Sequence, residues 1–249
     1  MIELDVGDGI ATLRINRPPV NAIDLPTIEQ MGVAMADIEA RRDLKALLVT
    51  GAGRCFSAGL DLKLVPTYGR DEQRRTIQGI NNLVGRLYGL PLPTVAAVNG
   101  HAIAGGLVLA LACDYRVGTK APCQIGLTEA RAGVPFPRVA MAVVQAELSP
   151  PAARRLTLVA RNSAPEAALA EGILDELQPE DRVLTRAQEL AAELGAISRV
   201  AYTRTKHQLR GTILAALADS ISGGTDPLLD DWLNPETPGA AAALLRNRD

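Results

Sequence analysis

The amino-acid sequence predicts an α/β fold in which short buried strands alternate with helices. Three stretches rich in β-branched and small apolar residues have the length of strands, at 10–15, 46–50 and 94–98. Two stretches with apolar residues at helical spacing separate them, at 26–42 and 71–90. A chain that alternates in this way packs helices in layers against a sheet, so we expect a layered α/β core.

The first part of the chain is expected to open with a β-hairpin. Residues 2–6 and 10–15 are rich in β-branched residues, and Gly7-Asp8-Gly9 supplies glycine where the turn needs positive φ. Two prolines at 18 and 19 end the hairpin before the first helix begins. The strand at 46–50 ends in Gly51-Ala52-Gly53, and two further prolines follow the second helix and lead into the strand at 94–98.

The second part of the chain is expected to be mostly helical. Residues 104–112 are small and apolar enough for a buried helix, and 114–117 and 124–126 can form short strands. A boundary near Gly195 would divide an α/β core at 1–195 from a helical segment at 196–249. That segment is too short to bury its own core, so it should pack on the α/β core or on a neighbouring subunit. From residue 139 onward the pattern predicts helices almost throughout, at 139–148, 152–160, 165–171, 182–194 and 197–220.

Composition excludes several classes of protein. The chain has 26 basic and 28 acidic residues and 3% aromatic residues, so a nucleic-acid or anionic-membrane surface is not expected. Its three cysteines form no CxxC pair and no metal-ligand spacing, which predicts a reducing compartment and no metal site. No basic stretch leads into an apolar run after Met1, and no apolar run has the length of a membrane span. We therefore expect a cytoplasmic protein.

Two loops that follow buried strands consist mainly of small residues. They are Phe56-Ser57-Ala58-Gly59-Leu60-Asp61-Leu62 and Asn99-Gly100-His101-Ala102-Ile103-Ala104-Gly105-Gly106. Small side chains allow a ligand to reach main-chain N–H groups, and a helix that starts at the second loop adds a positive dipole end. Together the loops can form an oxyanion hole, although glycines also serve tight turns and close packing.

Two other motifs match their templates poorly. Gly51-Ala52-Gly53 follows a strand, but the third glycine of a dinucleotide fingerprint would fall at Phe56. Ser57 lacks the glycine that a nucleophile elbow has two positions earlier, where this chain has Cys55. We therefore expect Ser57 to be a loop hydroxyl that bonds to the backbone.

The two loops, in this order, make the sequence closely resemble the crotonase superfamily of acyl-CoA enzymes. The resemblance covers most of the chain, and Arg17-Pro18-Pro19-Val20-Asn21-Ala22 matches the family's early coenzyme A loop. It implies the crotonase fold of repeated β-β-α units, with the C-terminal helical segment taking part in trimers or paired trimers. It also implies an acyl-CoA thioester substrate, held through its oxygen by the N–H groups of Ala58 and Gly105, and no cofactor besides the substrate's own coenzyme A.

The resemblance also indicates which reaction is catalysed. Hydratases of the superfamily carry two catalytic glutamates, and this chain has Val108 at the first position and Glu129 at the second. That single-glutamate pattern is most similar to the delta-3,delta-2-enoyl-CoA isomerases. The residues then expected to bind substrate are Ala22, Ala58, Gly59, Leu60, Asp61, Leu62, Gly105 and Thr128.

The chemistry of these residue types agrees with that interpretation. A proton alpha to a thioester is weakly acidic, and two N–H donors stabilise the enolate that forms when Glu129 removes it. Adding water needs a second polar group, which Val108 does not supply. Two alternatives stay open: a hydratase or hydrolase in which Glu129 activates water, and a non-catalytic acyl-CoA binder.

The surroundings of the site are expected to come from several parts of the chain. The segment 65–90 and the C-terminal tail should line the acyl pocket. Asp61 should cap a helix that follows the first loop. Trp232 should anchor the tail in the core or in an interface.

Overall fold

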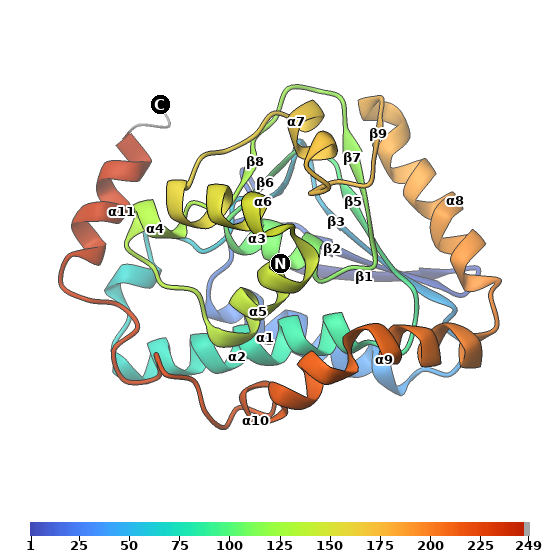
Figure 1. The fold of residues 1–249 in the computed structure, drawn as a ribbon, viewed down its shortest axis with the longest axis horizontal. Helices are drawn as coiled ribbons and strands as arrows, with labels where there is room; N and C mark the ends of the chain where they lie inside the picture. Colours follow the sequence, from blue (N-terminus) through green and yellow to red (C-terminus); the bar gives the residue numbers. More distant parts are fainter. Residues whose placement is uncertain (247–249) are drawn as a thin grey trace.

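The computed structural model describes residues 1–246, and its main sheet has six strands in the order β1-β2-β3-β5-β7-β9 (Figure 1). β1 pairs with β2 antiparallel as the predicted hairpin, and every other neighbouring pair is parallel. The middle strands β3 and β5 are buried along their whole length, which suits their small and apolar residues. The strands are β1 (Ile2–Gly7), β2 (Ile10–Ile15), β3 (Ala46–Gly51), β5 (Thr94–Val98), β7 (Tyr115–Thr119) and β9 (Glu176–Gln178).

A second sheet has three parallel strands, β4 (Cys55–Ser57), β6 (His101–Ile103) and β8 (Ile125–Gly126). Each of them comes a few residues after a strand of the main sheet and before a helix, so the chain repeats a strand–strand–helix unit. The sequence predicted loops at β4 and β6, because strands of this length are too short to show an alternating pattern.

Helices cover both faces of the main sheet. α8 packs across one face, where Ala46 and Leu48 of β3 point, while Leu47 and Val49 point into the larger core on the other face. That larger core lies under α1, α2, α3 and α5. The helices before the tail are α1 (Leu25–Ala40), α2 (Arg70–Gly89), α3 (Gly105–Leu111), α4 (Glu129–Ala132), α5 (Arg138–Glu147), α6 (Pro150–Arg154), α7 (Pro165–Ala170) and α8 (Val183–Gly195).

The region after residue 139 differs from the prediction at two points. β9 is an edge strand of sequence Glu-Leu-Gln, which is too short and too polar to stand out in a helix-rich stretch. The helix predicted at 152–160 divides into α6 and a π-helical turn, Arg155–Val159. Thr157 donates its hydroxyl to the carbonyl of Ala153, which competes with regular helical bonding, and Ala160 then ends the turn in the left-handed region.

The C-terminal tail packs against the core of its own chain. α9 and α10 lie against α2, and α11 lies against α4 (Figure 1). A buried ionic cluster fixes α9, because Lys206 Nζ lies 2.8 Å and Arg210 Nη1 lies 2.7 Å from Asp114 Oδ1. The part that this tail plays between subunits stays a prediction. Its helices are α9 (Arg199–Ala216), α10 (Ala218–Ile221) and α11 (Thr237–Arg246).

In residues 1–246, no helix combines the length and the apolar character needed to cross a membrane.

Candidate active site

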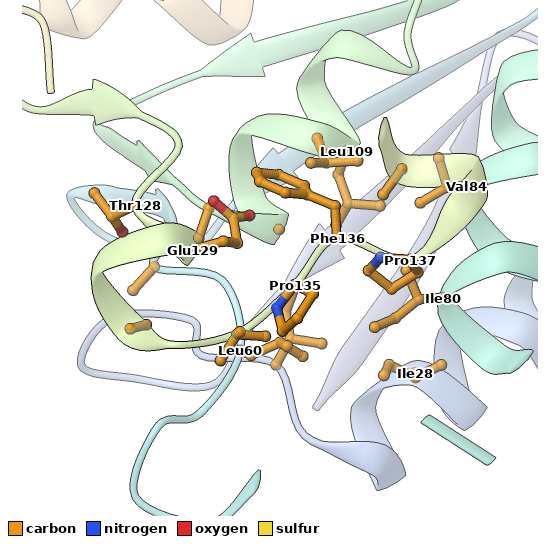
Figure 2. Close-up of a pocket in the computed structure, with 18 of the residues that line it drawn as sticks. Ile28, Leu60, Ile80, Val84, Leu109, Thr128, Glu129, Pro135, Phe136 and Pro137 are labelled. Atoms are coloured by element: carbon orange, nitrogen blue, oxygen red, sulfur yellow. The ribbon is translucent and has the colours of Figure 1, made fainter. Parts of the chain in front are cut away.

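An apolar pocket lies where the two loops of small residues meet α1, α2 and α5 (Figure 2). It encloses about 750 Å³ together with its open mouth. Among its lining residues in the described part of the chain, only Glu129 and Thr128 have polar side chains. The lining consists of Ile23, Ile28, Ala58, Leu60, Leu62, Ile80, Leu83, Val84, Ala104, Gly105, Val108, Leu109, Thr128, Glu129, Ala132, Val134, Pro135, Phe136, Pro137 and Ala140.

Glu129 places its carboxylate in this pocket, beside the ring of Phe136 (Figure 2). The residue begins α4, is 7% exposed, and its Oε2 atom has no hydrogen-bond partner among the described residues. Burial raises the pKa of Glu129 to about 8, although the backbone N–H groups of Glu129 and Thr128 oppose the shift. A carboxyl group that titrates near neutrality can both remove a proton and return it.

Val108 lies on α3 and lines the same pocket. It is 2% exposed, and its side chain has no hydrogen-bonding atom. Glu129 is therefore the one carboxylate of the lining within residues 1–246. A water molecule in this pocket would find one charged group to orient it rather than two.

The first loop is bonded to Ile23 in a way that leaves one N–H group free. Ile23 donates to the carbonyl of Gly59 and accepts from the N–H of Asp61, both at 2.8 Å. In such a parallel bridge, the residue between the two bonded ones turns its own N–H to the opposite side. The N–H of Leu60 therefore points away from Ile23, and it has no partner among the described residues.

Ala58, the donor predicted from the sequence, is already occupied. Its N–H donates to the carbonyl of Val20 at 3.0 Å, so it is not a free donor in this structure. The expectation that Ala58 supplies the donor is therefore corrected: the free N–H of this loop is that of Leu60. The motif alone could not separate the two residues, because both lie in the same loop and only pairing with distant residues decides where each N–H points.

The second loop presses directly against the first. A Cβ atom on Gly59, whose φ is +77°, would lie 2.8 Å from the Cβ of Ala104 and 2.9 Å from the nitrogen of Gly105. Glycine is required there by both the backbone conformation and the contact. Gly105 begins α3, so its N–H has no acceptor within the helix, and no other described residue accepts it. The unpaired N–H groups of Leu60 and Gly105 thus come from two loops in contact.

Asn21 joins the early loop to β4 and so supports the first loop. It is fully buried, and its Nδ2 donates to the carbonyls of Cys55 at 2.6 Å and Ala52 at 2.9 Å, while its Oδ1 accepts the N–H of Arg17 at 3.0 Å. Ser57 donates its hydroxyl to the carbonyl of Asn21 at 2.8 Å, which confirms the backbone-bonded role expected for Ser57. The sequence motif contained Asn21 without showing this role, because the contacts join segments far apart in the chain.

Two predicted substrate-binding residues lie outside the pocket lining. The carbonyl of Ala22 accepts from Arg17 at 3.2 Å. Asp61 forms an ion pair with Arg17 at 2.8 Å and accepts the N–H of Lys63 at 3.0 Å. The prediction that Asp61 caps the helix after the first loop is wrong, because that helix is the 3-10 segment Val65–Thr67 and its N-cap is Leu64. The other predicted residues lie in the lining or, for Gly59, directly behind it: Ala58, Gly59, Leu60, Leu62, Gly105 and Thr128.

The far end of the pocket consists of apolar side chains that the sequence did not single out. Ile28 from α1, and Ile80 and Val84 from α2, lie on the side of Phe136 away from Glu129 (Figure 2). The residues of α2 confirm that the segment 65–90 contributes to the lining. The expectation that the tail lines the pocket is wrong for this single chain, because no described residue after 195 belongs to the lining.

The family of the chain follows from comparison with known proteins. A model of the enoyl-CoA hydratase/isomerase family matches residues 5–226, and the chain belongs to this family. The family acts on acyl-CoA thioesters. Solved structures of its members share the fold of this chain, which confirms the predicted crotonase fold.

Relatives named after either reaction resemble the chain. A putative enoyl-CoA hydratase of Thermus thermophilus is 36% identical over 199 residues, which are 75% of this chain and 78% of that protein. The mitochondrial enoyl-CoA delta isomerase 1 of Mus musculus is 30% identical over 225 residues, 89% of this chain and 76% of that protein. The crystal structure of human mitochondrial delta3-delta2-enoyl-CoA isomerase matches with a TM-score of 0.87 at 26% identity, covering 100% of this chain and 97% of that chain. These names do not separate the two reactions.

Proposed function

We propose that this protein is an enoyl-CoA isomerase, which moves a double bond of an acyl-CoA thioester from the β,γ to the conjugated α,β position. One observation carries the proposal. Glu129 faces an apolar pocket that has no second carboxylate within the described residues. Val108 lines that pocket at the sequence position where a hydratase would carry its first catalytic glutamate. Proton transfer between two carbons of the substrate needs a single base, whereas hydration also needs a group that orients water.

The two unpaired N–H groups are the proposed binding site of the thioester oxygen. Removing the alpha proton places negative charge on that oxygen, and donors already in position stabilise it without reorganising. Leu60 and Gly105 supply one N–H each, and the positive end of α3 begins at Gly105. The apolar lining excludes water, which strengthens both hydrogen bonds.

Glu129 is the proposed carrier of the proton. Its carboxylate takes the proton from the alpha carbon, and the electron pair of the broken C–H bond passes into the dienolate. The same carboxyl group then returns the proton to the gamma carbon, where the dienolate supplies the electron pair of the new C–H bond. No proton is exchanged with a second residue, so the unpartnered Oε2 of Glu129 suits this role.

A direct competition between the two reactions tests the proposal. Purified protein is given a β,γ-enoyl thioester and an α,β-enoyl thioester of the same chain length, and conjugation and hydration are followed separately. We expect the ratio of isomerase to hydratase turnover to exceed about ten, which corresponds to about 1.4 kcal/mol between the two barriers. Equal turnover would replace the isomerase with a hydratase, and binding without conversion of either thioester would indicate an acyl-CoA binder.

A further inference from the structure

The pocket wall beside Glu129 is a segment without helix or strand. Residues 133–137 join α4 to α5, and their two prolines, Pro135 and Pro137, have no N–H to donate. Phe136 stands between these prolines and lines the pocket together with them. The carbonyls and N–H groups of such a segment need partners from elsewhere in the molecule.

Buried side chains of the C-terminal tail supply two of those partners. Trp232 donates its Nε1–H to the carbonyl of Pro135 at 2.9 Å, and Thr237 donates its hydroxyl to the carbonyl of Gly133 at 2.8 Å. Trp232 is 1% exposed and Thr237 is 0% exposed, which confirms that Trp232 anchors the tail in the core. Both donors are therefore committed to this one segment, and the Thr237 oxygen also accepts the N–H of Asn234 at 3.2 Å.

Asp226 fixes the other end of the segment and ties it to α2. Its Oδ2 accepts the N–H of Arg138 at 2.7 Å and the Nδ2 of Asn81 at 2.8 Å. The Oδ1 of Asn81 accepts the N–H of Val139 at 3.0 Å. Asn81 lies on α2, the helix that also carries Val84 of the apolar end, so the start of α5 is held at a set position relative to that end.

We infer that Asp226, Trp232 and Thr237, the C-terminal brace, are positioning residues that set the acyl specificity of the pocket. By holding residues 133–137 and the start of α5, they hold Phe136 between Glu129 and the apolar end, and the position of this ring decides which acyl chains fit. None of the three brace residues lines the pocket, so they act through Phe136. The inference rests on the proposed function, because it takes the pocket to be the acyl site.

Thr237 gives the sharpest test, because substitution by valine replaces only its hydroxyl group with a methyl group. Thr237→Val keeps the side-chain shape but removes the bond to Gly133 and the acceptor of the Asn234 N–H, while Thr237→Ser keeps the hydroxyl that makes both bonds. Thr203→Val is the matched control, since Thr203 also lies in the tail and donates to a carbonyl, that of Pro91 at 3.2 Å, outside the pocket. Fluorescence of Trp232, the single tryptophan, checks that each variant keeps the tail seated.

The measurement is the ratio of kcat/KM for hexenoyl and dodecenoyl thioesters with a β,γ double bond. We expect Thr237→Val to reduce the parent's preference between the two chain lengths at least about threefold, and Thr237→Ser and Thr203→Val to leave it unchanged. Phe136→Leu should alter the same preference, and adding Thr237→Val to it should have no further effect. An equal change of kcat/KM for both chain lengths in Thr237→Val would reduce the brace to a structural role and overturn the inference.

A binding experiment separates this inference from the proposed function. Hexanoyl-CoA and dodecanoyl-CoA, which are saturated and do not react, are titrated into the parent and the variants by calorimetry. If the parent binds neither, the proposed function fails. If the parent discriminates between them and Thr237→Val discriminates equally well, the inference alone fails. Should Thr237→Val not fold, Trp232→Phe keeps most of the buried volume, removes the N–H donor and is held to the same expectations.

Discussion

The two ends of the pocket are built in different ways. At the polar end, the groups proposed to bind the thioester oxygen are main-chain N–H groups, fixed by pairing of the first loop with Ile23 and by its contact with the second loop. At the apolar end, the walls are side chains such as Ile80 and Phe136, placed by packing between segments far apart in the chain. Backbone pairing fixes atoms more tightly than side-chain packing does. We therefore expect changes at the polar end to affect kcat and changes at the apolar end to affect KM and chain selection.

The largest effect should come from Glu129 at the polar end. Glu129→Gln keeps the shape of the side chain and removes the base, so turnover should fall at least about a hundredfold while acyl-CoA affinity changes little. Steady-state kinetics and calorimetric titration with a saturated acyl-CoA measure the two quantities. Glu166→Gln, a change at an exposed glutamate of α7, is the control. Turnover within a few-fold of the parent would remove Glu129 from the mechanism.

The pH dependence of the reaction should report the same carboxyl group. The burial that raises the pKa of Glu129 to about 8 keeps it protonated at lower pH, and a protonated carboxyl group cannot act as the base. Below pH 8, kcat/KM should therefore rise about tenfold for each pH unit, and above it the curve should level. A profile that levels near pH 5, the ordinary range of a glutamate, would show that the polar end is wetter than its burial indicates.

Two neighbouring glycines test how tightly the polar end is built. A Cβ atom on Gly105 would meet nothing closer than the Cα of Gly59 at 3.8 Å, so Gly105→Val should fold and should lower turnover at least about tenfold by filling the space before its N–H. A Cβ atom on Gly106 would lie 2.3 Å from the carbonyl oxygen of Ser57, so Gly106→Ala should destabilise the fold itself. Thermal unfolding and kinetics distinguish the two effects. A folded Gly105→Val protein with normal turnover would place the oxyanion site elsewhere.

The sequence predicted the polar end better than the apolar end for the same physical reason. Glu129 and Gly105 lie in contiguous motifs, so their neighbours along the chain revealed them. The choice of Leu60 over Ala58 depends on pairing with distant residues, and no local pattern reports the direction of an N–H group. Phe136 likewise owes its place to bonds from the tail that no helical or strand period encodes.

Three of the four short strands were missed for a related reason, whereas β8 lies within the strand predicted at 124–126. β4, β6 and β9 each have too few residues for a period of two to repeat, so their sequences resemble loops or helix ends. The longer elements were predicted nearly to their ends, because the buried face of α1 and α2 recurs several times along the sequence and because β3 is a continuous apolar run that is buried on both faces.

The smallest predicted effect lies at the apolar end. It tests whether this end affects KM without affecting the kcat that the polar end sets. Ile80 is half-buried on α2 and lines the pocket on the side of Phe136 away from Glu129. Ile80→Ala removes apolar contact with the acyl chain without touching the donors or the base. KM for a dodecenoyl thioester should therefore rise about threefold, with kcat changed less than about twofold. Val33→Ala, at a 73% exposed position of α1, is the control for loss of apolar volume. A fall in kcat as large as that of Gly105→Val would mean that packing at the apolar end also sets the geometry of the N–H groups, and an unchanged KM would mean that the acyl chain does not reach this end.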